Sequence, residues 1–100
     1  MEKLQYMVVF SLPSVLSEEF IQLIPEQRQV IDEWLIQGKI LSYSLSLDSN
    51  QLWIVALATN RSQLKKMLHK LPLFRHMAHK ISLLTFHNVI SAPIPAISLN

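Results

Sequence analysis

The strongest candidates for metal ligands in this chain are histidines, because the sequence contains no cysteine. His76 and His79 have the spacing of a ligand pair, and His87 could supply a third nitrogen. Zinc sites use three or four protein ligands, and nothing in the sequence fixes His87 beside the other two. We therefore expect no metal site. His87 remains a candidate for proton transfer, since histidine titrates near neutral pH.

Cysteine and glycine usage excludes several other kinds of site. Without cysteine there is no disulfide, thiolate metal site or cysteine nucleophile. Gly38 is the only glycine, so the chain has no glycine-rich loop that could hold a phosphate group. We expect a protein without a bound cofactor.

The composition is apolar for a domain of this size. Half of the 100 residues are hydrophobic and 16% are charged, against about a quarter charged in an average protein. One small domain has a thin core, and monomers avoid exposing a surplus of apolar surface. We therefore expect the chain to form a homo-oligomer.

Charge is divided unevenly along the sequence. All seven acidic residues lie between Glu2 and Asp48, whereas the part from Arg61 onward carries basic residues, all four histidines and no acid. Three explanations stay open: solvated helix faces of opposite sign, attraction of an anionic substrate, or a charged contact between subunits.

The sequence gives no sign of a membrane or nucleic-acid partner. No apolar segment reaches the roughly 18 residues of a membrane-spanning helix. Residues 1–14 have the pattern of a first strand rather than of a signal peptide, so we expect a cytoplasmic protein. RNA-binding sheets carry a glycine-aromatic motif on their third strand, where this chain has Trp53 and no glycine.

Two predicted strands are apolar on both faces. In residues 4–12, Tyr6, Val8 and Phe10 point to one side, whereas Met7 and Val9 point to the other. Residues 51–59 contain a similar run, whereas residues 39–47 alternate between apolar residues and serine. Strands with two apolar faces belong at the centre of a sheet, and strict alternation marks a half-buried strand.

Two helices are predicted between the strands. Ser17 caps the first, and Pro25 interrupts its pattern. We favour a short turn followed by a main helix over residues 25–37 that ends at Gly38. The second helix begins after Asn60 or Ser62.

A last strand is predicted over residues 79–87, followed by an uncharged tail, residues 89–100. Two prolines in this tail exclude a central strand. Because the tail is too apolar for a free end, we expect it to pack on a neighbouring subunit.

The order of elements is β-α-β-β-α-β, which predicts an α+β, ferredoxin-like fold over residues 1–88: an antiparallel sheet with two helices on one face. Right-handed crossovers place residues 4–12 and 51–59 side by side in the centre, and these are the strands with two apolar faces. A second copy of the chain, packed sheet to sheet, would cover the face that the helices leave open.

Residues 71–77, Leu-Pro-Leu-Phe-Arg-His-Met, resemble the closing motif of the muconolactone delta-isomerase family. The segment Phe-Ser-Leu-Pro at residues 10–13 and the predicted helix at 25–38 extend the resemblance over roughly residues 4 to 90. The resemblance implies a dimeric α+β barrel, often assembled into larger rings, and a reaction that moves a proton between two carbons of an unsaturated lactone.

That reaction implies roles for particular side chains. Tyr6 and Tyr43 are candidates to donate a hydrogen bond to the enolate oxygen, and Glu26 and His87 are candidates to move the proton. Structural explanations compete with these roles, because strand tyrosines are commonly core residues and an acid in the first turn of a helix compensates its dipole.

Substrate binding is less clearly marked. The family carries basic side chains on its second strand, where this chain has Leu41 and Leu45, so we assign substrate contacts to Ser42, Ser44 and His76. The alternative is a non-catalytic oligomer of the same fold that binds a small ligand or serves a structural role, which would explain the missing cations.

Overall fold

The computed structural model describes residues 2–86 and confirms the predicted order of elements. Its elements are β1 (Leu4–Ser11), α1 (Glu18–Gln37), β2 (Ile40–Leu45), β3 (Gln51–Ala58), α2 (Arg61–Leu68), a 3-10 turn η1 (Phe74–His76) and β4 (Ala78–Leu83). The predicted last strand is therefore shifted and shortened. His87, the tail at 89–100 and the predicted domain boundary at 88 lie outside the described residues.

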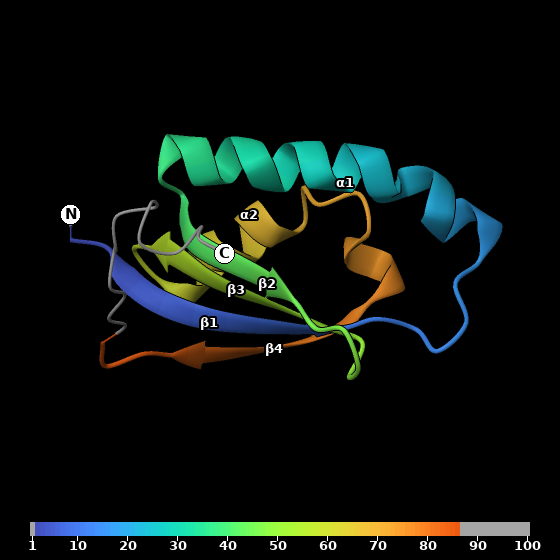
Figure 1. Cartoon of the computed structure of the whole chain (residues 1–100). Helices are drawn as coiled ribbons and strands as arrows, with labels where there is room; N and C mark the ends of the chain where they lie inside the picture. Colours follow the sequence, from blue (N-terminus) through green and yellow to red (C-terminus); the bar gives the residue numbers. More distant parts are fainter. Residues whose placement is uncertain (1, 87–100) are drawn as a thin grey trace, which may run out of the picture.

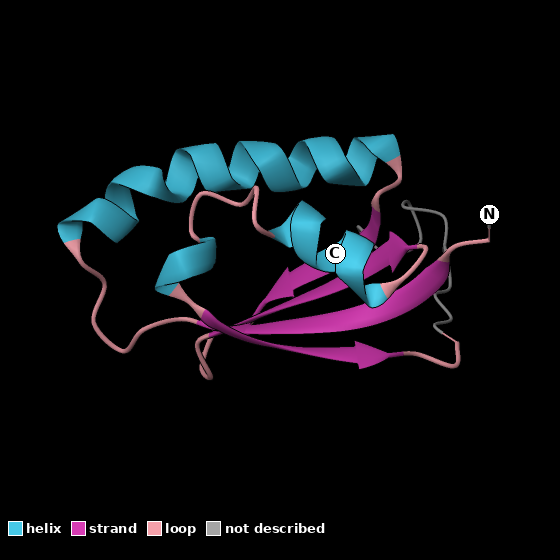
Figure 2. Ribbon diagram, turned by 180° about the vertical axis from the view of Figure 1, so that it is seen from behind, coloured by secondary structure: helices cyan, strands magenta, loops and turns pink. Residues whose placement is uncertain are grey.

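The four strands form one antiparallel sheet in the order β2-β3-β1-β4. The two strands with two apolar faces, β1 and β3, occupy the centre as predicted. Both helices lie on one face of this sheet and leave the other face open (Figures 1 and 2). The predicted α+β, ferredoxin-like arrangement is confirmed.

Helix α1 is continuous through Pro25, so the predicted division into a turn and a main helix is wrong. Ser17 caps it as expected, with its hydroxyl oxygen accepting the Phe20 N–H at 3.1 Å. A proline inside a helix removes one hydrogen bond and costs about 3 kcal/mol. The loss is tolerated because buried residues on both sides of Pro25 share one stripe against the core: Phe20, Gln27, Ile31 and Trp34. The first turns of α1 are inclined to the rest (Figure 1).

The end of α1 and the edge strand are set by two local features. Gly38 adopts a left-handed conformation, with φ of 77°, and its N–H bonds back to the last turn of the helix. Strand β2 then pairs with β3 through a register irregularity between Ile40 and Ser42. Ile40 is buried, whereas Leu45 is 65% exposed, because β2 lies at the edge of the sheet. The alternation of apolar residues and serine in β2 predicted a half-buried strand, but only Ile40 of this strand is buried.

Helix α2 begins after Asn60, so Asn60 rather than Ser62 is its N-cap. The Asn60 Oδ1 accepts the Gln63 N–H at 2.8 Å. Beyond Leu68 the chain turns through the Leu-Pro-Leu-Phe segment, and the buried Gln27 Oε1 accepts the Leu73 N–H at 3.0 Å. This bond joins the motif of residues 71–77 to α1.

The main core lies between the sheet and the helices. Alternate residues of β1 and β3 meet α1, α2 and the Leu-Pro-Leu-Phe segment there, including Tyr6, Val8, Phe10, Ile54, Leu64, Leu68, Leu71 and Leu73. Trp34 belongs to this core. Trp53 does not, because it pairs with Val9 and projects from the open face.

The open face of the sheet has an apolar centre. Met7 pairs with Val55, and Val9 with Trp53, on the face opposite the helices. Val55 is buried, yet it lies outside the contiguous core.

Within residues 2–86 no helix is long and apolar enough to cross a membrane.

Candidate functional site

The predicted catalytic residues do not converge in the described part of the chain. Tyr6 is buried in the core beneath α2, with the Arg61 guanidinium 5.7 Å from its ring centre. Tyr43 lies on β2, on the far side of β3 from Tyr6, and Glu26 is exposed on α1. Three hollows on the surface of residues 2–86 are lined by other side chains than these three.

Tyr43 is engaged by α1 rather than free for a substrate. Its hydroxyl donates to the Asp32 Oδ1 at 2.6 Å. This hydrogen bond raises the pKa of the Tyr43 phenol, partial desolvation and the Asp32 charge raise it further, and the Arg28 charge opposes the rise. The phenol therefore keeps its proton at neutral pH and directs it at a carboxylate of its own chain.

The three predicted substrate contacts fall on two different faces. Ser42 and Ser44 pair with Val55 and Trp53 and so lie on the open face of the sheet. His76 lies on the helix side, with its ring edge-on to Phe20 and its Nε2 at 3.8 Å from the Glu19 Oε2. A substrate on the open face would not reach His76.

His76 and His79 have separate environments. His79 packs against Phe10 and Phe74, with ring centres 5.8 Å and 5.0 Å away, whereas His76 contacts Phe20. The part of the chain that the structure describes has no group of three or more side chains able to hold a metal ion.

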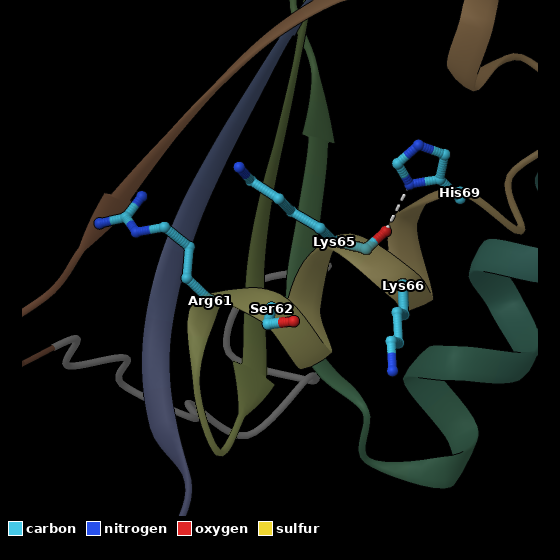
Figure 3. A pocket seen from close by; sticks show the side chains of 5 residues that line it. All are labelled: Arg61, Ser62, Lys65, Lys66 and His69. Carbon is cyan, nitrogen blue, oxygen red and sulfur yellow. Dashed lines mark hydrogen bonds between the residues drawn. The ribbon is translucent and has the colours of Figure 1, made fainter.

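A basic hollow on α2 is the site-like feature that the residue-by-residue prediction missed. This feature, which we call the α2 basic hollow, is shallow and encloses about 560 Å³. It is lined by the side chains of Arg61, Ser62, Lys65, Lys66 and His69. Arg61 and Lys65 reach toward the β1 and β4 side of the helix, whereas Lys66 points the other way (Figure 3). The sequence signal for it was the absence of acids after Asp48.

Two members of the α2 basic hollow are held in place. The Arg61 guanidinium donates to the Ile81 carbonyl oxygen at 3.2 Å and lies over the Tyr6 ring. The His69 Nδ1–H donates to the Lys65 carbonyl oxygen at 2.7 Å, and its ring lies 4.2 Å from Phe74. Within residues 2–86 none of the three cations of the hollow is paired with a carboxylate.

Comparisons with known proteins support the fold. No family model matches the chain, and no curated protein matches its sequence. The solved structure of muconolactone isomerase matches 88% of this chain and 97% of its own, with a TM-score of 0.70 at 18% identity.

Two further solved structures match at lower TM-scores. MtbAldR matches 90% of this chain with a TM-score of 0.58 at 14% identity, and this chain spans 58% of that protein. The uncharacterized protein TM1266 of Thermotoga maritima matches 84% of this chain and 100% of its own, with a TM-score of 0.54 at 15% identity. The predicted resemblance to muconolactone isomerase is thus confirmed as a resemblance of fold.

Proposed function

We propose that this protein assembles through the open face of its sheet into a dimeric α+β barrel and acts as a non-catalytic oligomer with a small-ligand-binding or structural role. The observation that carries the proposal is the apolar centre of the open face, formed by Met7, Val9, Trp53, Val55 and Leu57. In a single copy Met7, Val9, Trp53 and Leu57 are partly exposed around the buried Val55. A second copy packed sheet to sheet would bury this surface.

The size and chemistry of the open face fit a second copy. Two strands of eight residues and two of six give a face of about 450 Å² per copy at the usual strand spacing and rise. Two such faces come to roughly 900 Å², close to the 1,000 Å² expected of a biological interface. Polar residues border the apolar centre, with Ser42 and Ser44 on β2 and Lys80 on β4. This apolar centre and polar border are typical of protein interfaces.

Light scattering coupled to size-exclusion chromatography tests the assembly. We expect a dimer or larger species at micromolar concentration, and a monomer for Val9→Lys, because a buried lysine without a partner is costly. Val9→Lys should still fold, since its face is open in one copy. Ile36→Lys is the matched control, because Ile36 is 85% exposed on α1. A monomeric wild-type protein, or equal disruption by both variants, would refute the proposal.

The tail at residues 89–100 is the second part of the assembly proposal. Its apolar, proline-containing sequence is suited to packing on a neighbouring subunit. Deleting residues 89–100 should reduce the size of the assembly or lower its melting temperature. A deletion variant with an unchanged mass and melting temperature would rule this role out.

Catalysis is the second candidate function, favoured by the match to 97% of the muconolactone isomerase chain. The reaction would move a proton from one carbon of an unsaturated lactone to another, with no change in formula. Tyr6, Glu26, Tyr43 and His87 would share proton transfer and enolate stabilisation. The separation of Tyr6, Glu26 and Tyr43 in one chain favours the non-catalytic function.

Deuterium exchange detected by NMR tests catalysis directly. The protein is incubated with muconolactone in D₂O, and an isomerase would shift the double bond and introduce deuterium at carbon. Tyr6→Phe, Glu26→Gln and Tyr43→Phe should each slow turnover if these side chains act. Absence of turnover by the wild-type protein, or turnover insensitive to all three changes, would contradict the assigned roles.

A further inference from the structure

We propose that the α2 basic hollow binds a small organic anion, a carboxylate or phosphate attached to an apolar body. Three cationic side chains and a histidine line one shallow hollow, and no carboxylate within residues 2–86 neutralises them. The proposal does not depend on catalysis. It also does not depend on sheet-to-sheet assembly, because α2 lies on the opposite face of the sheet (Figure 2).

The spacing of the cationic residues places them on one side of the helix. Arg61, Lys65 and His69 are four residues apart in succession, so their side chains follow one another along a single stripe of α2. Lys65 is exposed and lies between the other two. An anion above Lys65 would therefore lie close to the positive charges of both Lys65 and Arg61.

Preorganisation distinguishes this stripe from a solvated row of lysines. The Arg61 guanidinium is fixed by the Ile81 carbonyl oxygen and the Tyr6 ring. The His69 ring is fixed at the other end of the hollow, because its Nδ1–H is engaged by the Lys65 carbonyl oxygen and its ring packs on Phe74. Groups that are already ordered lose less entropy when they bind a ligand.

The surroundings of Arg61 supply the apolar part of the site. The Arg61 guanidinium contacts Ile81 of β4, and Leu83, two residues further along the same face of β4, is 54% exposed. Leu83 also pairs with Tyr6. An anion held by Lys65 and Arg61 can therefore place an apolar body against the exposed Leu83 side chain.

A nucleic acid fits this surface less well. Single-stranded nucleic acids bind basic grooves that also offer aromatic faces for base stacking. Here the Tyr6 ring is buried, and the Phe74 ring lies between His69 and His79. Neither ring offers a free face beside the cations.

Binding of anilinonaphthalene sulfonate to the full-length protein, followed by fluorescence, tests the proposal. Uncharged N-phenylnaphthylamine has the same aromatic body without the anion and measures purely apolar binding. Lys65→Glu should weaken sulfonate binding by at least about tenfold, because it removes a charge-assisted contact and adds a repulsive charge. Lys70→Glu is the matched control: it makes the same change in net charge, but Lys70 lines the neighbouring hollow, with Lys3 and Lys39, which shares only Lys66 with the α2 basic hollow.

The expected result is salt-sensitive sulfonate binding that Lys65→Glu weakens and Lys70→Glu leaves within about twofold. Backbone NMR shifts on titration should centre on residues 61–69. Equal binding of the neutral probe, equal losses in both variants, or shifts centred on the open sheet face would overturn the proposal. Displacement of the sulfonate by a lower concentration of a short single-stranded oligonucleotide would also overturn it, in favour of a nucleic-acid site.

Discussion

The cap of helix α2 provides a sharp test of the structure, because the sequence offered Asn60 and Ser62 equally. The Asn60 Oδ1 accepts the Gln63 N–H at 2.8 Å, and the Gln63 Oε1 accepts the Thr59 N–H at 2.6 Å. Asn60→Ala removes the first of these bonds. A side-chain cap contributes about 1 kcal/mol, with a range of roughly 0.5–2 kcal/mol. The value should lie in the upper half of this range, because α2 has eight residues and no acid in its first turn.

Urea unfolding at one fixed protein concentration measures the effect, since concentration alters the stability of an oligomer. Asn60→Ala should lower the free energy of unfolding by about 1–2 kcal/mol, and each kcal/mol corresponds to about 4–8 °C in melting temperature. Ser62→Ala should cost less than about 0.5 kcal/mol, because Ser62 is exposed. Asn60→Asp should keep the stability, since a carboxylate accepts the same bond and suits the helix dipole. Equal losses from Asn60→Ala and Ser62→Ala would refute the assigned cap.

Three further predictions concern α1 and its neighbours. Absorbance titration should show Tyr43 ionising above the ordinary pKa of tyrosine, about 10, and Asp32→Asn should lower the pKa of Tyr43. Because this pKa is higher in the folded than in the unfolded state, the stability contributed by the Tyr43–Asp32 hydrogen bond is complete below about pH 10. It is lost as pH rises through the folded pKa. Gly38→Ala should cost about 1–2 kcal/mol in urea unfolding through its left-handed backbone alone, since no atom beyond the adjacent residues lies within 4 Å of the added Cβ. An unchanged stability would contradict that conformation. Pro25→Ala should raise the melting temperature by restoring a helical N–H, and a lower melting temperature would show that the proline is required there.

The fold was predictable because burial on two sides leaves a strong pattern in a strand. The apolar faces of β1 and β3 identified the central strands, and the structure confirms them. Pro25 misled the prediction because local propensity favoured a break, whereas the stripe containing Phe20 and Ile31 holds one continuous helix on the core. Tertiary packing thus outweighed a local rule.

The site was less predictable because it depends on register and on pairings between distant residues. Alternation shows that Trp53 and Ile54 face opposite ways, but only the packing of Ile54 with helix residues in the core shows which face the helices cover. Gln27 gives no sequence signal for its bond to Leu73, which lies 46 residues away. Tyr43 is likewise engaged by Asp32 across two elements.

The uneven distribution of charge can now be related to the two faces of the sheet. Among strand residues on the open face, Lys80 supplies a charge, whereas the apolar pairs Met7–Val55 and Val9–Trp53 fill the centre. The basic residues of α2 are on the opposite side, in the layer that also contains α1. A sheet-to-sheet contact would therefore use little of the charge of this chain. Of the three explanations for the acid-free second half, a charged contact through this interface fits least, and attraction of an anionic ligand to α2 accounts for the arrangement best.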